Sequence, residues 1–508
     1  MDNHAQIDWA AEAAATERST RVFIGASDQE PNGTRIKLQN PADGQAGLDY
    51  RGSSERQIDE AVKVARDSQG GGRWWNMPAA ARRACLVRLS ELMTQNAATL
   101  AIHDCMDVGK PISLAQTEAH IASSMCLYFG ELADKLYAGR IAPSDPGSNA
   151  LQVRKPRGVV AAIVPWNFPI INATLKLAPA LAAGNSVLLK PSELSPGSAQ
   201  ILVGLCLEAG MPPGTVSFLP GDGGVGSALA HHAGVDMLTF TGSTATGKAL
   251  MRAAGDSTIK PLLLECGGKS PELVFEDARH LGVNALASAI IGGCMANQGQ
   301  LCVARSRLYV QESLYDELVT EIRSQLEAMK PGVPLDAATT FGPLASPNQL
   351  SRVLELIESG VNDGANLLVD GREASRPNDG GCYLAPSLFA NTDPSMRIHR
   401  EEIFGPVLSV ASFANEAEAV ELANSTDYGL AATAWTTDLG RSQRLIRKIE
   451  TGGLQIRSTA DQRFGAGWGR EGEPAGQSGF GIEGGQLGVY SYTRVQWIQF
   501  DFALDEAD

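Results

Sequence analysis

An alternation of apolar runs and helical segments between residues 158 and 240 constrains the fold of this chain more than any other feature. Four short runs have the length and β-branched content of buried strands, and they cover residues 158–164, 186–190, 216–219 and 237–240. Helical segments separate these runs, at about 169–182, 195–210 and shortly before residue 237. Strands that alternate with helices form a doubly wound parallel sheet. We therefore predict an α/β fold whose ligands bind beyond the carboxyl ends of these strands.

The rest of the chain gives weaker signals. Apolar spacing predicts helices over 56–68 and 79–104, and the α/β alternation returns over about 270–440. Residues 452–488 contain twelve glycines and little periodicity, so we expect a loop there. An alternating run at 490–500 predicts a strand, and pairing with a short strand at 151–155 would form an arm outside both domains.

Composition excludes several classes of function. A length of 508 residues suits two or three packed domains. The formal net charge of −15 and the lack of a long basic run argue against nucleic acid or a membrane as a partner. Eight cysteines without a CxxC pair, and an N-terminus without a secretory signal, indicate free thiols in the cytoplasm. The seven histidines show no ligand spacing, so we expect no metal site.

Among the cysteines, Cys302 has the surroundings of a reactive thiol. It ends the segment Asn297-Gln298-Gly299-Gln300-Leu301-Cys302, in which polar residues and a flexible glycine precede it. A lone cysteine is usually a buried structural residue. A reactive thiol needs access and groups that hold the thiolate. Both interpretations stay open on this segment alone.

A carboxylate at residue 265 follows an apolar run. Glu265 comes directly after Leu262–Leu264, where burying a carboxylate is costly unless it has a partner or a task. One interpretation pairs it with Lys269 or makes it a helix cap. The other makes it a general base whose pKa burial raises, so that it can deprotonate a water molecule near neutral pH.

A rigid amide ends the first strand. Asn167 stands in Pro165-Trp166-Asn167-Phe168-Pro169, where two prolines fix the backbone. The segment is either a plain strand terminator or a site in which the Asn167 amide, aided by the backbone N–H of Cys302, stabilises an oxyanion.

Two segments suit a dinucleotide. Residues 240–248, FTGSTATGK, lead from a strand into a helix, and their backbone N–H groups would receive a phosphate. This is not the GxGxxG fingerprint and is weak alone. Lys190-Pro191-Ser192-Glu193 closes the preceding strand, where Lys190 and Glu193 would bind ribose hydroxyls. A lysine and a glutamate at a strand end are otherwise simply solvated.

Taken together, these segments resemble the aldehyde dehydrogenase superfamily. The motifs PWNFP, KPSE, FTGSTATGK, LECGGK, NQGQLC and EEIFGP occur in the family's order and approximate spacing, over about residues 35–500. The resemblance implies a Rossmann-type dinucleotide-binding domain (21–140 and 158–268), an α/β catalytic domain (269–475) and a β arm (141–157 and 476–503). It also implies a homodimer or homotetramer built through that arm.

The resemblance implies a role for each matched residue. Cys302 would be the nucleophile, Asn167 the oxyanion donor, Glu265 the base for the hydrolytic water and Lys176 a family lysine near the site. The cofactor, NAD⁺ with NADP⁺ as the alternative, would contact Trp166, Lys190, Ser192, Glu193, Gly242, Ser243, Glu402 and Phe404. Glu193 would repel a 2′-phosphate, which favours NAD⁺. The activity implied is oxidation of an aldehyde to a carboxylic acid through a thioester.

The sequence departs from the family pattern at two places. Cys266 replaces the usual leucine, either as packing or as an oxidant-sensitive thiol. Near the C-terminus, many relatives carry a proline-phenylalanine-glycine-glycine run with a lysine and an SGxGRE stretch. Here PAGQSGFGIE is shorter, has Ala475 after the proline in place of phenylalanine and lacks the lysine and arginine, and Glu483 would take the place of the family's late glutamate.

The substrate is not decided by the sequence. By position, the pocket would be lined by Phe168, Asn172, Leu175, Leu301 and Val303, with Phe464 and Trp468 at the entrance. This mostly apolar set slightly favours an aromatic or bulky aldehyde. The arginines of the 457–473 loop would instead bind the carboxylate of a semialdehyde, or simply face solvent. A coenzyme A-acylating enzyme and a catalytically silent family member also remain open, although retention of Glu265, Asn167 and Cys302 argues against both.

Overall fold

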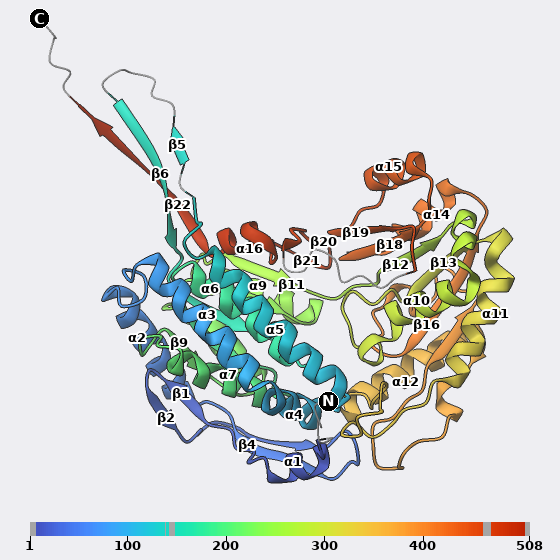
Figure 1. Ribbon diagram of the computed structural model, residues 1–508, viewed down its shortest axis with the longest axis horizontal. Coiled ribbons are helices and arrows are strands. Elements are labelled where there is room, and N and C mark those ends of the chain that lie inside the picture. Colours follow the sequence, from blue (N-terminus) through green and yellow to red (C-terminus); the bar gives the residue numbers. More distant parts are fainter. Residues whose placement is uncertain (1–6, 138, 142–147, 461–468, 503–508) are drawn as a thin grey trace, which may run out of the picture.

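The structure is a computed structural model that describes residues 7–137, 139–141, 148–460 and 469–502. Two sheets with flanking helices form the body, and a thin β arm projects from one side of it (Figure 1). The predicted α/β fold with parallel sheets is confirmed.

The first sheet contains the alternating region. In the described residues its order is β2 (Ser27–Gln29), β1 (Val22–Ile24), β9 (Val216–Phe218), β8 (Ser186–Lys190), β7 (Val159–Ile163), β10 (Met237–Thr241), β11 (Leu262–Glu265) and β21 (Gly479–Phe480). Neighbouring strands from β9 to β11 are parallel. The chain runs outward from β7 to β9 and then returns to β10 on the other side of β7. The crevice for a ligand in such a sheet lies at this reversal, beyond the ends of β7 and β10.

Alternating side chains bury both faces of this sheet. In β7, Val160 and Ala162 pack in one core with helices α3 (Ala79–Gln95), α4 (Ala97–Val108), α5 (Ile112–Leu132), α6 (Pro169–Ala182) and α7 (Gly197–Glu208). Val159, Ala161 and Ile163 pack in a second core with α2 (Glu55–Gly70), α8 (Gly223–His231) and α9 (Thr244–Ser257). Burial on both faces explains why the strands are continuous apolar runs.

The second sheet is built in the same way from residues 271–457. Its described strands are, in order, β14 (Asn366–Val369), β15 (Ser387–Ala390), β16 (Val407–Phe413), β13 (Arg307–Gln311), β12 (Pro271–Val274), β18 (Ala431–Trp435) and β19 (Gly453–Arg457). Helices α10 (Val283–Met295) and α11 (Glu312–Ala328) cover one face, and α14 (Glu416–Ala423) and α15 (Leu439–Lys448) cover the other. A further helix, α12 (Pro347–Asn362), packs in a smaller core beside them.

The arm is a separate three-stranded sheet. β6 (Ser148–Pro156) lies between β22 (Thr493–Asp501) and β5 (Gly139–Ile141), and all neighbours are antiparallel. The pairing expected between 151–155 and 490–500 is therefore confirmed. Of the 476–503 segment only β22 lies in the arm, because β21 joins the first sheet and α16 (Gly485–Ser491) packs against α5 and α6.

Three predicted boundaries are wrong. The helix expected at 79–104 is two helices, α3 and α4, separated at Asn96. The glycine-rich stretch 452–488 is not all loop, since β19, two short strands and the start of α16 lie within it. The last strand begins at Thr493, because Tyr490 belongs to α16.

Candidate active site

The catalytic loop around Cys302 is held by two close backbone approaches. A Cβ on Gly299 would lie 2.2 Å from the carbonyl oxygen of Gly405, and a Cβ on Gly268 would lie 2.2 Å from the carbonyl oxygen of Cys302. Only glycine permits such contacts. The segments NQGQLC, LECGGK and EEIFGP therefore meet at one place, as the resemblance implied.

Asn167 joins this loop from the other sheet. It follows β7, its side chain is buried, and its Nδ2 donates to the carbonyl of Gln300 at 3.0 Å. Its Oδ1 accepts a longer bond of 3.4 Å from Nδ2 of Asn172, one turn into α6. The amide is thus bound to the residue two positions before Cys302.

Glu265 is the last residue of β11 and lies beside a buried ion pair. Lys176, on α6, pairs with Glu483 from the C-terminal segment. Burial raises the pKa of Glu265 well above its ordinary value, the charge of Glu483 raises it further, and the charge of Lys176 opposes both. The alternative in which Lys269 pairs with Glu265 is wrong: among the described residues the Lys269 Nζ has no hydrogen-bond partner.

The surroundings of the Cys302 thiol disfavour its thiolate form. Burial raises its pKa to about 12, and the carboxylates of Glu402 and Glu265 add to this, whereas the backbone N–H groups of Val303 and Cys302 oppose it. A thiol in this environment needs a base before it can act as a nucleophile.

Trp166 and Phe404 form a contact between the two sheets. Their ring centroids are 5.3 Å apart in an edge-on arrangement, and Phe404 has a positive φ of 57°. The carboxylate of neighbouring Glu402 accepts a hydrogen bond of 2.9 Å from the N–H of Gly268, and burial raises its pKa to about 7. Gln349, which sequence analysis missed, donates to the Phe404 carbonyl at 2.8 Å and holds this segment.

The remaining predicted cofactor residues lie at the ends of β8 and β10. The Nζ of Lys190 is 3.9 Å from the carboxylate of Glu193, and burial lowers the pKa of Lys190. The hydroxyl of Ser192 is used within the loop, where it accepts the N–H of Leu194 at 3.2 Å. Ser243 caps α9 by accepting the N–H of Thr246 at 3.2 Å.

Gly242 links this cofactor region to the base. Its N–H donates to the carbonyl of Glu265 at 3.0 Å, so the turn after β10 is attached to the end of β11. A displacement of the turn after β10 would therefore also displace Glu265 at the end of β11.

The predicted pocket residues are partly exposed, as a binding surface requires. Phe168, Asn172, Leu175, Leu301 and Val303 are all neither fully buried nor fully exposed. Phe464 and Trp468 lie outside the described residues. Tyr128 of α5 is a candidate that sequence analysis missed: it is partly exposed, and a Cβ on Gly469 would lie 3.5 Å from its hydroxyl.

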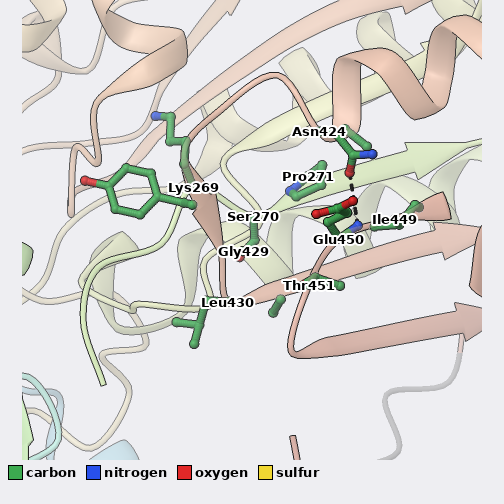
Figure 2. A pocket seen from close by; sticks show the side chains of 12 residues that line it. Lys269, Ser270, Pro271, Asn424, Gly429, Leu430, Ile449, Glu450 and Thr451 are labelled. Carbon is green, nitrogen blue, oxygen red and sulfur yellow. Dashed lines mark hydrogen bonds between the residues drawn. The ribbon is translucent and has the colours of Figure 1, made fainter. Parts of the chain in front are cut away.

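A small pocket is lined by Lys269, Tyr428, Leu430, Glu450 and neighbouring residues (Figure 2). None of the predicted site residues lines it. The amine of Lys269 points away from the other labelled side chains (Figure 2). The pocket therefore does not coincide with the predicted aldehyde-binding residues.

Two features are absent from the described residues. Within these residues, no three His, Cys, Asp or Glu side chains are grouped so that they could hold a metal ion. No described helix combines the length and the apolar character that crossing a membrane would require.

Comparison with known proteins identifies the family. The model of the aldehyde dehydrogenase family matches residues 28–498. The NADP/NAD-dependent aldehyde dehydrogenase PuuC of Escherichia coli is 43% identical over 406 residues, which is 80% of each chain.

Two solved structures superimpose closely on this chain. An indole-3-acetaldehyde dehydrogenase of P. syringae, in complex with NAD⁺ and IAA, has a TM-score of 0.93 at 38% identity and covers 97% of this chain and 99% of its own. A gamma-glutamyl-gamma-aminobutyraldehyde dehydrogenase of Burkholderia cenocepacia has a TM-score of 0.92 at 37% identity and covers 98% and 99%.

The family match, the parallel sheets and the arrangement of the motifs around Cys302 all indicate the same family. Residues 28–498 include every motif that meets around Cys302. The chain belongs to the aldehyde dehydrogenase family, and it is an NAD(P)-dependent oxidoreductase that oxidises aldehydes.

Proposed function

We propose that the enzyme converts its aldehyde to the carboxylic acid through a covalent adduct on Cys302. The observation that carries this proposal is that three groups converge on one loop: the thiol of Cys302, the amide of Asn167 and the carboxyl of Glu265. A nucleophile, an oxyanion donor and a base are the groups that oxidation through a thioester requires.

In the first step the sulfur of Cys302 bonds to the carbonyl carbon, and the thiol loses its proton. Glu265 is the group we assign to accept this proton, because its charge already acts on the thiol. The Asn167 amide and the backbone N–H of Cys302 then stabilise the oxyanion. Among the described residues the amide donates one bond, to Gln300, and it carries a second N–H for this purpose.

The residues at the ends of β7, β8 and β10 fit a nicotinamide dinucleotide. Buried Lys190 and adjacent Glu193 suit ribose hydroxyls, and the N-terminus of α9 suits the pyrophosphate. Glu402 and Phe404, opposite Trp166, suit the nicotinamide riboside. A nicotinamide held by these residues would supply the acceptor for the hydride that leaves the tetrahedral carbon. The negative charge of Glu193 favours NAD⁺ over NADP⁺.

Glu265 acts again in the second step, when water cleaves the thioester. A buried carboxyl with a raised pKa is basic enough to take a proton from water near neutral pH. Lys176 and Glu483 lie beside it and tune that basicity. The retained Glu265 favours water over coenzyme A as the acceptor of the acyl group.

For the substrate we propose an aromatic or bulky aldehyde. The predicted lining is mostly apolar, and on α6 Leu175 is smaller than an aromatic residue would be. One relative of similar fold is an indole-3-acetaldehyde dehydrogenase. Another relative of similar fold is a gamma-glutamyl-gamma-aminobutyraldehyde dehydrogenase. An ω-carboxylated aldehyde is therefore the second candidate substrate.

A panel of aldehydes followed at 340 nm tests this proposal. Aliphatic, aromatic and ω-carboxylated aldehydes are compared with NAD⁺ and NADP⁺, with and without coenzyme A. We expect kcat/KM for aromatic aldehydes to exceed that for short aliphatic ones by about 10- to 100-fold, as differences in apolar contact allow. NAD⁺ should be the better cofactor.

Two results of the panel would contradict parts of the proposal. A preference for ω-carboxylated aldehydes would contradict the aromatic substrate and assign the arginines of the 457–473 loop to the carboxylate. A strict requirement for coenzyme A would contradict the hydrolytic step.

We infer that the arm builds a homodimer or homotetramer. β22 is an outer strand of the arm sheet, so one of its edges is unpaired, and an unpaired edge is a site for pairing with another chain. Val495 and Trp497, on one face of β22, are 52% and 63% exposed. Apolar side chains of this size on a projecting strand fit a second copy of this chain.

The double variant Val495→Lys, Trp497→Glu is expected to dissociate the assembly. Light scattering after size exclusion should show a smaller species, while circular dichroism stays unchanged because both side chains are exposed. Leu439→Glu, at a 74% exposed apolar position on α15, is the matched control. An unchanged mass for the double variant would mean that the arm does not form the interface.

We also infer a reducing compartment, the cytoplasm. All eight cysteines are free. Proteins that keep many unpaired thiols are typical of reducing compartments.

A further inference from the structure

The main-chain carbonyl of Asn167 accepts two hydrogen bonds from different parts of the fold. The Nζ of Lys110, between α4 and α5, donates at 2.9 Å, and the Nδ2 of Asn297, in the catalytic loop, also donates at 2.9 Å. The same Asn297 amide donates to the carbonyl of Gln300 at 3.2 Å, and that carbonyl also accepts from the side chain of Asn167. One peptide group therefore connects the helices of the first sheet to the loop that carries Cys302.

Lys110 is buried together with its counter-ion. Its side chain and that of Glu118 are 0% and 2% exposed, and the Nζ lies 2.6 Å from each carboxylate oxygen of Glu118. The ring of Phe168 covers the ammonium at 4.1 Å. Burying an ion pair in this way is no more stabilising than a well-packed apolar pair of the same volume. Stability alone therefore does not explain these charges.

The adjacent backbone is fixed at a second point. The Oδ2 of Asp104, on α4, accepts the N–H of Ile170 at 3.3 Å, where α6 begins. The segment from Asn167 to Ile170 is thus held by Lys110 at one end and by Asp104 at the other. Neither residue lies among the predicted cofactor or pocket residues.

We propose that Lys110, held by Glu118, is a positioning residue that sets the direction of the Asn167 amide relative to Cys302. The proposal rests on the oxyanion role of Asn167 given above. Loss of the Lys110 bond would leave this carbonyl held by Asn297 alone, and a tilt of the peptide would move the amide away from the developing oxyanion. A displacement of about 1 Å at such a donor lowers a rate by up to about 100-fold.

The test combines single and double variants of the full-length enzyme. Lys110→Met is expected to lower kcat by about 10- to 100-fold with little change in KM for NAD⁺. Asn167→Ala alone is expected to lower kcat by about 100- to 1000-fold, as the loss of an oxyanion donor does. If Lys110 acts through Asn167, the double variant is no slower than Asn167→Ala, because the two effects are not additive.

Lys260→Met is the matched control. Lys260 is 5% exposed and its Nζ also binds main-chain carbonyls, those of Ala230 and His232 at 2.8 and 2.9 Å. It lies at the end of β11 remote from Glu265, so its loss should leave kcat unchanged.

A second variant covers the case in which Lys110→Met does not fold. Glu118→Gln keeps the donor to Asn167 and removes only the charge of its partner, so we expect a smaller loss of kcat.

Two results would overturn the proposal: a wild-type kcat for folded Lys110→Met, or effects of Lys110→Met and Asn167→Ala that multiply in the double variant. If Lys110→Met cannot be folded, an unchanged kcat for Glu118→Gln would overturn the proposal. A wild-type kcat for Asn167→Ala would instead refute the oxyanion role itself, which distinguishes the two failures.

Discussion

Cys302→Ala is expected to abolish aldehyde oxidation while leaving cofactor binding intact. The sulfur is the atom that bonds to the substrate, and alanine offers no nucleophile in its place, so kcat should fall by at least about 10⁴-fold. The residues that suit the ribose and pyrophosphate lie at the ends of β8 and β10 in the first sheet, whereas Cys302 lies on the loop before β13 of the second sheet. Absorbance at 340 nm reports turnover, and a fluorescence titration with NADH reports binding.

Cys85→Ala is the control for this variant. Cys85 is a partly exposed thiol on α3, away from the catalytic loop, and its loss should leave turnover unchanged. Substantial turnover by Cys302→Ala would contradict the proposed nucleophile. Cys266, the residue next to Glu265, would then be the alternative nucleophile. Burial raises the pKa of the Cys266 thiol to about 11.

Glu265→Gln is expected to separate the two steps of the reaction. Glutamine has the shape of glutamate but cannot accept a proton, so release of the acid should slow by about 100-fold or more. In rapid mixing, the variant should still form about one NADH per active site, but more slowly than the wild type because the thiol proton must pass to solvent, and the steady-state rate should be lower still. An unchanged steady-state rate would show that another base activates the water.

The pH dependence of acid release gives a second signature of Glu265. Burial and the charge of Glu483 raise the pKa of Glu265, and only the deprotonated form is a base, so the rate should rise with pH until that pKa is passed. Glu483→Gln removes one of the charges that raise the pKa and leaves the Lys176 ammonium in place. The rising limb should therefore move to lower pH in Glu483→Gln and disappear in Glu265→Gln.

The local sequence was sufficient to predict the parallel strands of the first sheet, but not every boundary of the helices and strands. Val159–Ile163 and Ser186–Lys190 are buried on both faces, so each appears as a continuous apolar run. The break at Asn96 was missed because apolar spacing continues through it into α4. β19 was missed because Gly452 and Gly453 precede it, and its pairing with β18 is a tertiary contact that local spacing does not reveal.

The site was predicted from motif order rather than from any segment alone. Asn167, Glu265 and Cys302 are far apart in the sequence, and each had an ordinary structural interpretation. Lys110 was missed, yet its partner gave a signal. Ile112, Ala115, Ala119 and Ala122 form the buried stripe of α5, and Glu118 falls within that stripe. A charge at a core position of a helix indicates a buried partner.

The C-terminal segment imposes an order on biosynthesis. Although most of the first sheet is encoded in the first half of the chain, Tyr492 is 1% exposed in its core and donates to Thr239 at 3.1 Å. The edge strand β21 and Glu483 also come from the C-terminal end of the chain. The apolar core of the first sheet therefore stays incomplete until Tyr492 has been translated, and an incomplete core exposes apolar surface that is prone to aggregation. Neither this core nor the surroundings of Glu265 are complete without residues 479–492, so a chain that lacks them exposes apolar surface and has no partner for Lys176.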